Sequence, residues 1–185
     1  MSVVTWLGCD LVTGKVVEEL PDLVPSGPLS ALLGACTSAG FSLPIPPSPR
    51  NWEGATEPAR SMIVAVLGGQ PIWAGTILPR DGGTDPGAPL GCVSLEGYLE
   101  RRYVGDHTWT QQDEASVIAA GLIGDSNTVE DIGFTVDAPA TGTLRDRTYK
   151  DQDDKTVYSA LRELSGVIDG PEWTIVLGWT DATQT

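Results

Sequence analysis

The chain has 185 residues, with 25 acidic and 11 basic side chains and a formal net charge of -14. Phosphate backbones are held by clustered Lys and Arg, and no such run occurs, so sequence-specific nucleic-acid binding is not expected. No apolar run approaches the ~20 residues of a membrane span, and no secretory signal follows Met1, which predicts a soluble protein. The length suits one domain, or one domain with an insertion.

The acidic balance has two interpretations that composition cannot separate. It can serve solubility alone, or it can form a surface that repels a polyanion passing close by. The cysteines are Cys9, Cys36 and Cys92. They are odd in number, far apart and without a CxxC spacing, so we expect buried thiols in a reducing compartment rather than a disulfide framework or a zinc site.

The first forty residues predict a hairpin followed by a short helix. Val3 to Cys9 and Lys15 to Leu20 are strand-like runs that flank a turn ending at Gly14. Pro28 fits the first position of a helix over residues 28–39. Apolar residues recur there with helical spacing and Gly40 stands where a C-cap would lie; the stripe is Leu29, Leu32, Leu33 and Cys36.

The stretch from Phe41 to Pro49 carries four prolines in nine residues. It must be extended and is not expected to be a central strand, because proline lacks the N–H that a sheet ladder needs. A ligand for a proline-recognising module is one interpretation. We favour a rigid crossover connection.

The central stretch, Arg60 to Arg80, predicts two apolar strands joined by a tight turn. Met62 to Leu67 and Ile72 to Leu78 are the strands, and Gly68-Gly69 tolerates the positive φ that a short hairpin connection requires. Both runs are too apolar for strands with one wet face, so the hairpin should lie inside a barrel or sandwich. After a loop over residues 81–89, a third core strand is expected over residues 90–95.

The second half predicts two helices and a closing strand. Thr110 and Asp113 resemble a capping box before a helix that ends near Gly124. A polar loop over residues 125–143 follows, with a short strand near residues 134–136. A further helix begins near Asp153 or Asp154 and stops at Gly166. Alternating large apolar residues then predict a strand over residues 173–179. Such a strand near the end of the sequence suggests a sheet that continues in residues beyond this sequence or is completed by another chain.

A search for reactive constellations predicts no catalytic, cofactor-binding or metal-binding residue. His107 is the single histidine and lies in a polar segment, which is typical of a solvated loop histidine. An aspartate cluster resembles a calcium loop, but without the glycine and glutamate in place it fits N-capping better: Asp151, Asp153 and Asp154. Four glutamates could supply a glycosidase pair, but their spacing selects none: Glu53, Glu96, Glu100 and Glu172.

Tryptophans and one basic pair complete the candidate list. Trp73, Trp173 and Trp179 stand in apolar strands, so core packing is expected for them rather than a role as sugar platforms. Arg101-Arg102 is the densest basic spot in the chain, and either a salt-bridged turn or a contact with a partner would account for it.

Several phrases, in order, resemble the N-terminal part of minor tail proteins of long-tailed actinobacterial phages and prophages: TWLGCDLVTGKVVEELP, FSLPIP, WEGATEPARSMIVAVLGGQPIWAGTILPRDGG, SLEGYLERRYVGDHT and DGPEWTIVLGW. Such proteins are similar to the baseplate hub proteins of phage tails and contractile injection systems. The resemblance covers most of the chain. It implies an α+β fold, mainly an antiparallel β-barrel or sandwich with a small inserted α/β domain that carries two helices.

On this resemblance, residues 1–95 are the β-rich hub barrel portion, with the short helix near residues 28–39. Residues 96–185 are the inserted domain and a closing strand. The implied function is structural and not enzymatic: a homotrimeric hub in the virion tail tip, assembled in the host cytoplasm. It would join tube and tail-tip proteins around a channel through which DNA passes non-specifically. The alternative is a carbohydrate-binding or carbohydrate-active tail-tip domain that uses Trp and acidic residues.

Overall fold

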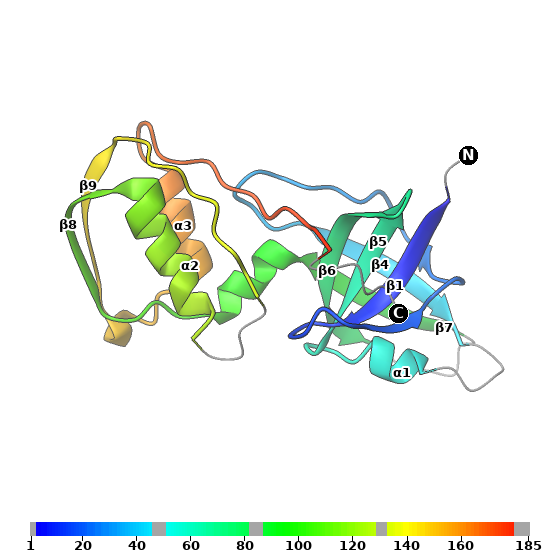
Figure 1. Ribbon diagram of the computed structural model, residues 1–185. Coiled ribbons are helices and arrows are strands. Elements are labelled where there is room, and N and C mark those ends of the chain that lie inside the picture. The colour runs from blue at the N-terminus through cyan, green and yellow to red at the C-terminus, as the bar shows by residue number, and fades with distance from the viewer. Residues whose placement is uncertain (1–2, 46–50, 82–86, 129–132, 180–185) are drawn as a thin grey trace. The chain divides into compact units, whose positions relative to one another are not determined.

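Figure 1 shows the computed structural model, which describes residues 3–45, 51–81, 87–128 and 133–179. The chain divides into two compact units. Unit 1 comprises residues 1–31, 36–95 and 175–185, and unit 2 comprises residues 32–35 and 96–174. The fold is mixed α+β and consists mostly of antiparallel sheet, as expected from the sequence.

Unit 1 is built on one seven-stranded antiparallel sheet with the order β2-β1-β5-β6-β7-β4-β3. The strands are β1 (Val4–Asp10), β2 (Val16–Glu19), β3 (Val24–Pro25), β4 (Ser38–Pro44), β5 (Ser61–Leu67), β6 (Gln70–Arg80) and β7 (Gly87–Ser94). The predicted opening hairpin, the central hairpin and the third core strand are therefore confirmed as β1–β2, β5–β6 and β7.

The central hairpin has both faces covered, as its composition predicted. Ile63 and Ala65 of β5 belong to the main core, while Val64 and Val66, which point to the other face, are also buried. Gly68 and Gly69 form the connection with φ of 59° and 82°. These angles are strained for residues with a Cβ, which explains the paired glycines.

The sheet must curl strongly, because its two edges are joined by a short piece of chain. Strand β2 lies at one edge and β3 at the other, and only residues 20–23 connect them. Seven flat strands would separate the edges by roughly 29 Å, or six spacings of about 4.8 Å. The five residue steps from Glu19 to Val24 reach at most about 18 Å. Curling also explains why Trp6 on β1 contacts Phe41 on β4, with ring centroids 5.4 Å apart, although three strands separate them in the sheet.

The curled sheet encloses the core of unit 1. Its largest members include Phe41, Trp73 and Ile77, and Leu20 and Leu23 from the connection between the edges close it. The short helix α1 (Trp52–Ala55) packs against β1 at Gly8. A Cβ at Gly8 would lie only 2.6 Å from the Ala55 carbonyl oxygen, so this close approach requires glycine.

Unit 2 combines a two-stranded ribbon with two helical segments (Figure 1). The ribbon pairs β8 (His107–Asp113) with β9 (Leu144–Tyr149). A π-helical turn, η2 (Glu114–Ala119), continues directly into α2 (Ala120–Ser126), and α3 (Val157–Ser165) packs beside it. The 3₁₀ turns η1 (Leu95–Arg101) and η3 (Asp151–Asp153) precede β8 and α3. The core of unit 2 includes Leu99, Ile118, Leu122, Leu161 and Leu164.

Two predictions for the first half are wrong. Residues 28–39 form no helix: they make an irregular loop with a bridge between Leu32 and Ala35, and β4 begins at Ser38. The apolar stripe does not face a core as a whole: Leu29 packs against the core of unit 1, whereas Leu32 and Leu33 are 55% and 63% exposed. The stretch from Phe41 is extended as expected, but its first residues belong to β4, which has β7 on one side and β3 on the other. Pro44 is the last residue of β4, so its missing N–H removes no hydrogen bond from the interior of the strand. Residues 46–50 lie outside the described residues.

The predictions for the second half need four corrections. Asp113, not Thr110, caps the second helix, which runs to Ser126 rather than Gly124. No strand forms over the described residues 134–136. The third helix is confirmed, but its cap is Thr156, and its side chain accepts from the Ser159 N–H. The described residues 173–179 have alternating burial but pair with no strand.

Candidate functional site

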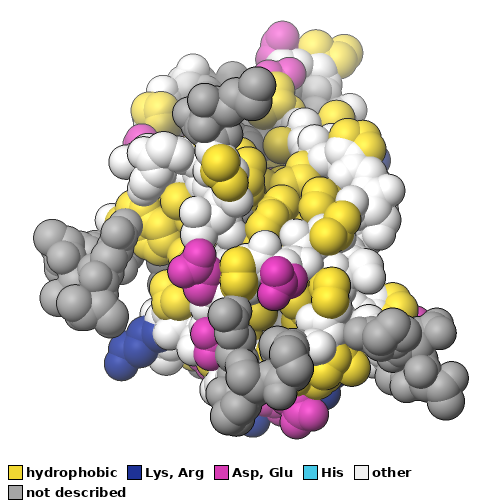
Figure 2. Space-filling view, turned by 90° about the vertical axis from the view of Figure 1, so that its right-hand side faces the viewer, with side chains coloured by type: hydrophobic (Ala, Val, Ile, Leu, Met, Phe, Trp, Pro, Cys, Tyr) yellow, Lys and Arg dark blue, Asp and Glu magenta, His cyan; other side chains and the backbone are white. Residues whose placement is uncertain are grey.

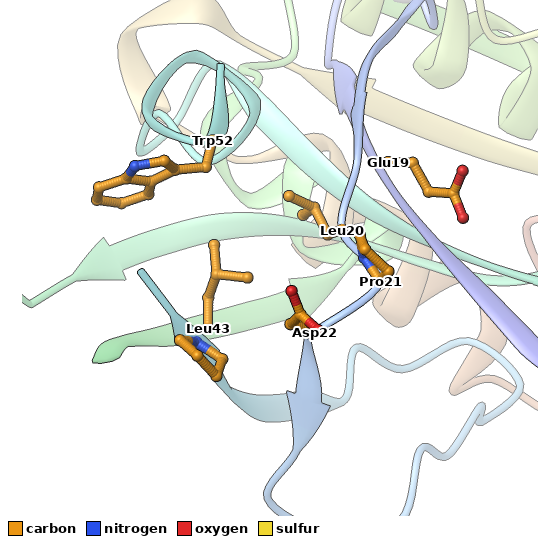
Figure 3. Close-up of a pocket in the computed structure, with 7 residues that line it drawn as sticks. Glu19, Leu20, Pro21, Asp22, Leu43 and Trp52 are labelled. Atoms are coloured by element: carbon orange, nitrogen blue, oxygen red, sulfur yellow. The ribbon is translucent and has the colours of Figure 1, made fainter. Parts of the chain in front are cut away.

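A shallow groove in unit 1 lies where the connection between the sheet edges meets α1 (Figure 3). Its lining comes from the end of β2, the connection, the end of β4 and the start of α1: Glu19, Leu20, Pro21, Asp22, Leu43, Pro44 and Trp52. Leu20 and Leu43 point toward the side where Trp52 lies, and the Glu19 carboxylate points away from it. The groove is therefore an apolar floor with acidic side chains at its margin.

The groove is small and is fixed by local contacts. Even with the space that is open to solvent included, its empty volume is only about 210 Å³, so the groove is smaller than typical small-molecule pockets of roughly 300 to 1,000 Å³. The guanidinium of Arg80 lies 5.6 Å from the centre of the Trp52 ring and donates a hydrogen bond to the Glu53 carbonyl at 2.7 Å. The indole of Trp52 is half-buried and packs against the core of unit 1, so it can cover a flat apolar partner group but cannot enclose one.

His107 does not lie in a solvated loop, so that prediction is wrong. It begins β8, its ring stacks on Trp109 at 4.4 Å, and its Nε2 lies 2.8 Å from the Asp125 carboxylate at the end of α2. The two side chains are only 27% and 16% exposed. Asp125 also accepts a hydrogen bond from the Gly105 N–H. This arrangement ties β8 to α2 and leaves no nucleophile beside the imidazole among the contacts of the described residues.

Asp113 and Glu114 form the polar junction of unit 2. The Asp113 carboxylate accepts backbone hydrogen bonds from Ser116, Gly142 and Ala115, which lower the pKa of Asp113 to about 2. The fully buried Glu114 forms an ion pair with Arg145 of β9, and the Arg145 guanidinium also donates to the Ile168 carbonyl. The junction fixes the start of the helix against the ribbon, which is a structural role.

The candidate glutamates are dispersed over the chain. Glu53 is an exposed residue of α1 in unit 1, whereas the other three belong to unit 2. Glu96 is buried in η1, Glu100 is exposed and accepts from the Thr156 hydroxyl, and Glu172 is exposed in the last segment. Among the described contacts, no two of these carboxyl groups form a common site.

The aspartate cluster and the basic pair also have structural roles. Asp151 and Asp153 lie in η3 and Asp154 follows in a left-handed conformation, so they precede α3 without capping it. The Arg102 guanidinium lies 4.3 Å from the centre of the Tyr98 ring and donates to the Tyr98 hydroxyl, while Arg101 is exposed. The pair is therefore a cation–π contact and a surface charge rather than a salt-bridged turn.

The cysteines are free thiols, and two of them are buried. Burial raises the pKa of Cys9 to about 11 and that of Cys92 to about 12, so neither thiol is reactive at neutral pH. Cys36 is half-buried, in contrast to the expectation for all three. Within the described part of the chain, no group of three or more His, Cys, Asp and Glu side chains could hold a metal ion.

The tryptophans divide into core and half-buried positions. Trp73 is a core residue with 6% exposure, as predicted. Trp173 and Trp179 are only half-buried: Trp173 packs edge-on against Tyr158, and the indole N–H of Trp179 donates to the Gly69 carbonyl at 2.8 Å. The alternating sequence predicted that the side chains of Trp173 and Trp179 share one face, but it did not predict that no strand pairs with this stretch.

The last candidate feature is a set of exposed apolar side chains on the surface. Figure 2 shows hydrophobic side chains gathered across the middle of one face, with acidic side chains among them and at the upper and lower ends, and basic ones toward the margins. Exposed large apolar residues of unit 1 include Val3, Val16, Val24 and Ile72. Exposed apolar patches bounded by polar residues are typical of protein contacts.

Comparisons with known proteins do not assign the chain to a family. No protein-family model matches the chain, and no curated protein matches it. None of the described helices combines the length and the apolar character that crossing a membrane requires.

Proposed function

We propose that this chain is a structural minor tail protein that forms the baseplate hub at the distal end of a phage tail tube. It would join the tube to the tail tip and line the DNA channel. The observation that carries the proposal is the agreement between the architecture that the sequence resemblance implies and the fold. A curled antiparallel sheet is interrupted after residue 95 by an α/β unit, and the chain returns to the first unit at residue 175.

The character of the candidate sites also supports a structural role. The polar clusters around His107, Asp113 and Arg102 tie elements of unit 2 together, and each has an evident structural function. The groove beside Trp52 is too small for a typical substrate pocket. The proposed structural role requires no catalytic residue and no cofactor.

The charge balance fits a channel wall. In a ring, which the resemblance implies is a homotrimer, the acidic side chains of each copy should be enriched toward the axis, because fixed negative charge keeps a passing polyanion from adhering. DNA would then be a non-specific passenger, and the stable partners would be other copies, tube proteins and tail-tip proteins. The protein would reside in the virion tail tip after assembly in the host cytoplasm.

A cryo-electron microscopy map of assembled tails that contain this chain tests the proposal. We expect copies of the chain in a ring at the distal end of the tube, with Asp and Glu side chains on the inner wall. A map with the chain peripheral to the tail axis, or an inner wall lined by Lys and Arg, would refute it.

One observation favours the second candidate function, a carbohydrate-binding or carbohydrate-active tail-tip domain. Trp52 offers a half-buried indole at a groove that also has Glu19 and Asp22 at its margin. A glycan array and a hydrolysis screen on the isolated protein test this alternative, with Trp52→Ala as the site variant and Trp109→Ala in unit 2 as the matched control. Binding that is lost only in Trp52→Ala would support a sugar site, and no binding by the parent would reject it.

A further inference from the structure

The stretch over residues 173–179 has the side-chain pattern of a strand but no strand beside it. Burial alternates strictly: Trp173, Ile175, Leu177 and Trp179 are half-buried, and the residues between them are exposed. The backbone of residues 174–178 forms no hydrogen bond within the described structure. Thr174, Val176 and Gly178 are exposed, so their backbone groups are open to water and equally open to a second strand.

The alternating burial indicates an extended backbone, from which we infer the free edge of the stretch. In an extended chain, the N–H and C=O of one residue point to the same edge, and those of its neighbours point to the opposite edge. The Trp173 carbonyl accepts from the Gly34 N–H at 2.8 Å, which occupies the edge shared by odd-numbered residues. The opposite edge therefore carries the backbone groups of Thr174, Val176 and Gly178.

The sequence of the stretch is nearly symmetric about Val176. Reading outward from this residue, Ile175 matches Leu177, Thr174 matches Gly178 in small size, and Trp173 matches Trp179. In an antiparallel pair of two identical strands, each residue therefore faces one of its own kind. Val176, whose side chain is 85% exposed, would face Val176 of the second copy.

We propose that two free copies of this chain associate through residues 173–179, as antiparallel strands related by a two-fold axis at Val176. Val176 with its counterpart, and Thr174 with Gly178 of the second copy, would be the hydrogen-bonded positions, because their backbone groups point to the free edge. Ile175 and Leu177 would face each other between them. A two-fold interface requires this kind of self-complementary surface, whereas a strand from an unrelated protein would not require symmetry about Val176.

The expected association is weak. A pair of seven-residue strands buries less than the ~800 Å² per partner of a standard interface, and each copy carries a net charge of -14. The dimer should therefore dissociate on dilution at low salt and strengthen with ionic strength, since salt screens the repulsion. The inference concerns the free chain and does not depend on a role in a phage tail.

Disulfide trapping tests the pairing and its register. Opposite residues at a hydrogen-bonded antiparallel position have Cα atoms about 5.5 Å apart, which is within the range that a disulfide spans. Val176→Cys should cross-link to itself under mild oxidation. Thr174→Cys is the matched control: it is also exposed, but in this register it lies four residues, or about 13 Å, from its own counterpart. Both variants are made in a Cys36→Ser background, because Cys9 and Cys92 are buried.

Sedimentation velocity over a dilution series gives a second measurement. The parent and Val176→Thr should show an apparent mass that rises toward twice the monomer mass with concentration. Val176→Asp should remain monomeric, because it places two carboxylates opposite each other. Circular dichroism spectra must match between the variants, which the exposure of Val176 makes feasible.

Three results would overturn the proposal: a parent that stays monomeric at high concentration and high salt, no cross-link at Val176→Cys, or equal cross-linking of Val176→Cys and Thr174→Cys. The last result would indicate parallel or unspecific contact. None of these results bears on the position of the chain in an assembled tail, so failure here is distinguishable from failure of the proposed function.

Discussion

Replacing Trp73 by Ala should remove the central side chain of the core of unit 1. The indole is 6% exposed, and its ring centroid lies 5.8 Å from that of Phe41. A tryptophan buries about 150 to 250 Å², which at roughly 25 cal/mol/Å² corresponds to about 4 to 6 kcal/mol. This is an upper bound, because the unfolded chain already buries part of that surface. We therefore expect Trp73→Ala to lower the free energy of unfolding of unit 1 by about 3 to 5 kcal/mol.

Two control variants separate core packing from other effects. Within the described structure, the Trp73 indole N–H is buried without a hydrogen-bond partner. Trp73→Phe removes this unpaired donor and keeps an aromatic ring, so it leaves a smaller cavity and should cost less than Trp73→Ala. Trp179→Ala, at a half-buried position, should cost less than Trp73→Ala. Urea unfolding followed by circular dichroism measures all three, and a Trp73→Ala protein within about 0.5 kcal/mol of the parent would refute the core assignment.

Three further predictions concern other parts of the chain. Gly8→Ala should destabilise unit 1 by about 1 to 3 kcal/mol, because its Cβ would meet the Ala55 carbonyl at 2.6 Å; a midpoint of urea unfolding equal to that of the parent would contradict this. Because its pKa is lowered in the folded state, the ionised Asp113 carboxylate stabilises unit 2 above pH ~4, and this stabilisation is lost as pH falls toward about 2. Asp113→Asn should therefore make the stability of unit 2 less dependent on pH in this window. An unchanged acid-unfolding profile would count against the N-cap role of Asp113. No single substitution of a candidate acid or base should abolish function by removing a catalytic group; the candidates are His107, Glu96 and Glu172. A variant at one of these positions that folds and assembles but loses a hydrolytic activity would overturn that reasoning.

The strands of unit 1 were predictable because their residues satisfy two requirements at once. Residues 62–67 and 72–78 are apolar on both faces, and Gly68-Gly69 supplies the turn, so local preference and burial agree. The prediction of a helix over residues 28–39 was wrong because it rested mainly on the helical spacing of apolar residues. The stripe at Leu32 and Leu33 has the spacing of a helix, but the structure leaves both side chains exposed.

The contacts of the polar residues could not be predicted in the same way. His107 and Asp125 are 18 positions apart, and the ribbon and α2 bring them together only when unit 2 has folded. Likewise, Glu114 and Arg145 meet across 31 positions. Nothing in local spacing selects such pairs. The clearest available signal was Asp113 directly before an apolar helical run, which is a typical N-cap position.

The stretch over residues 173–179 explains what an alternating pattern does and does not specify. Alternation of large apolar and small or polar residues determines which side chains are covered, and the half-buried Ile175 and Leu177 follow that rule. It does not determine which backbone will bond to the strand, because the hydrogen-bonding edges are perpendicular to the side-chain faces. Symmetry about Val176 is a separate property of the sequence, and it favours one partner above others: an identical strand in the opposite direction. A strand pattern without a ladder in the single chain is therefore information about assembly, and the exposed Val176 is the residue at which it can be tested.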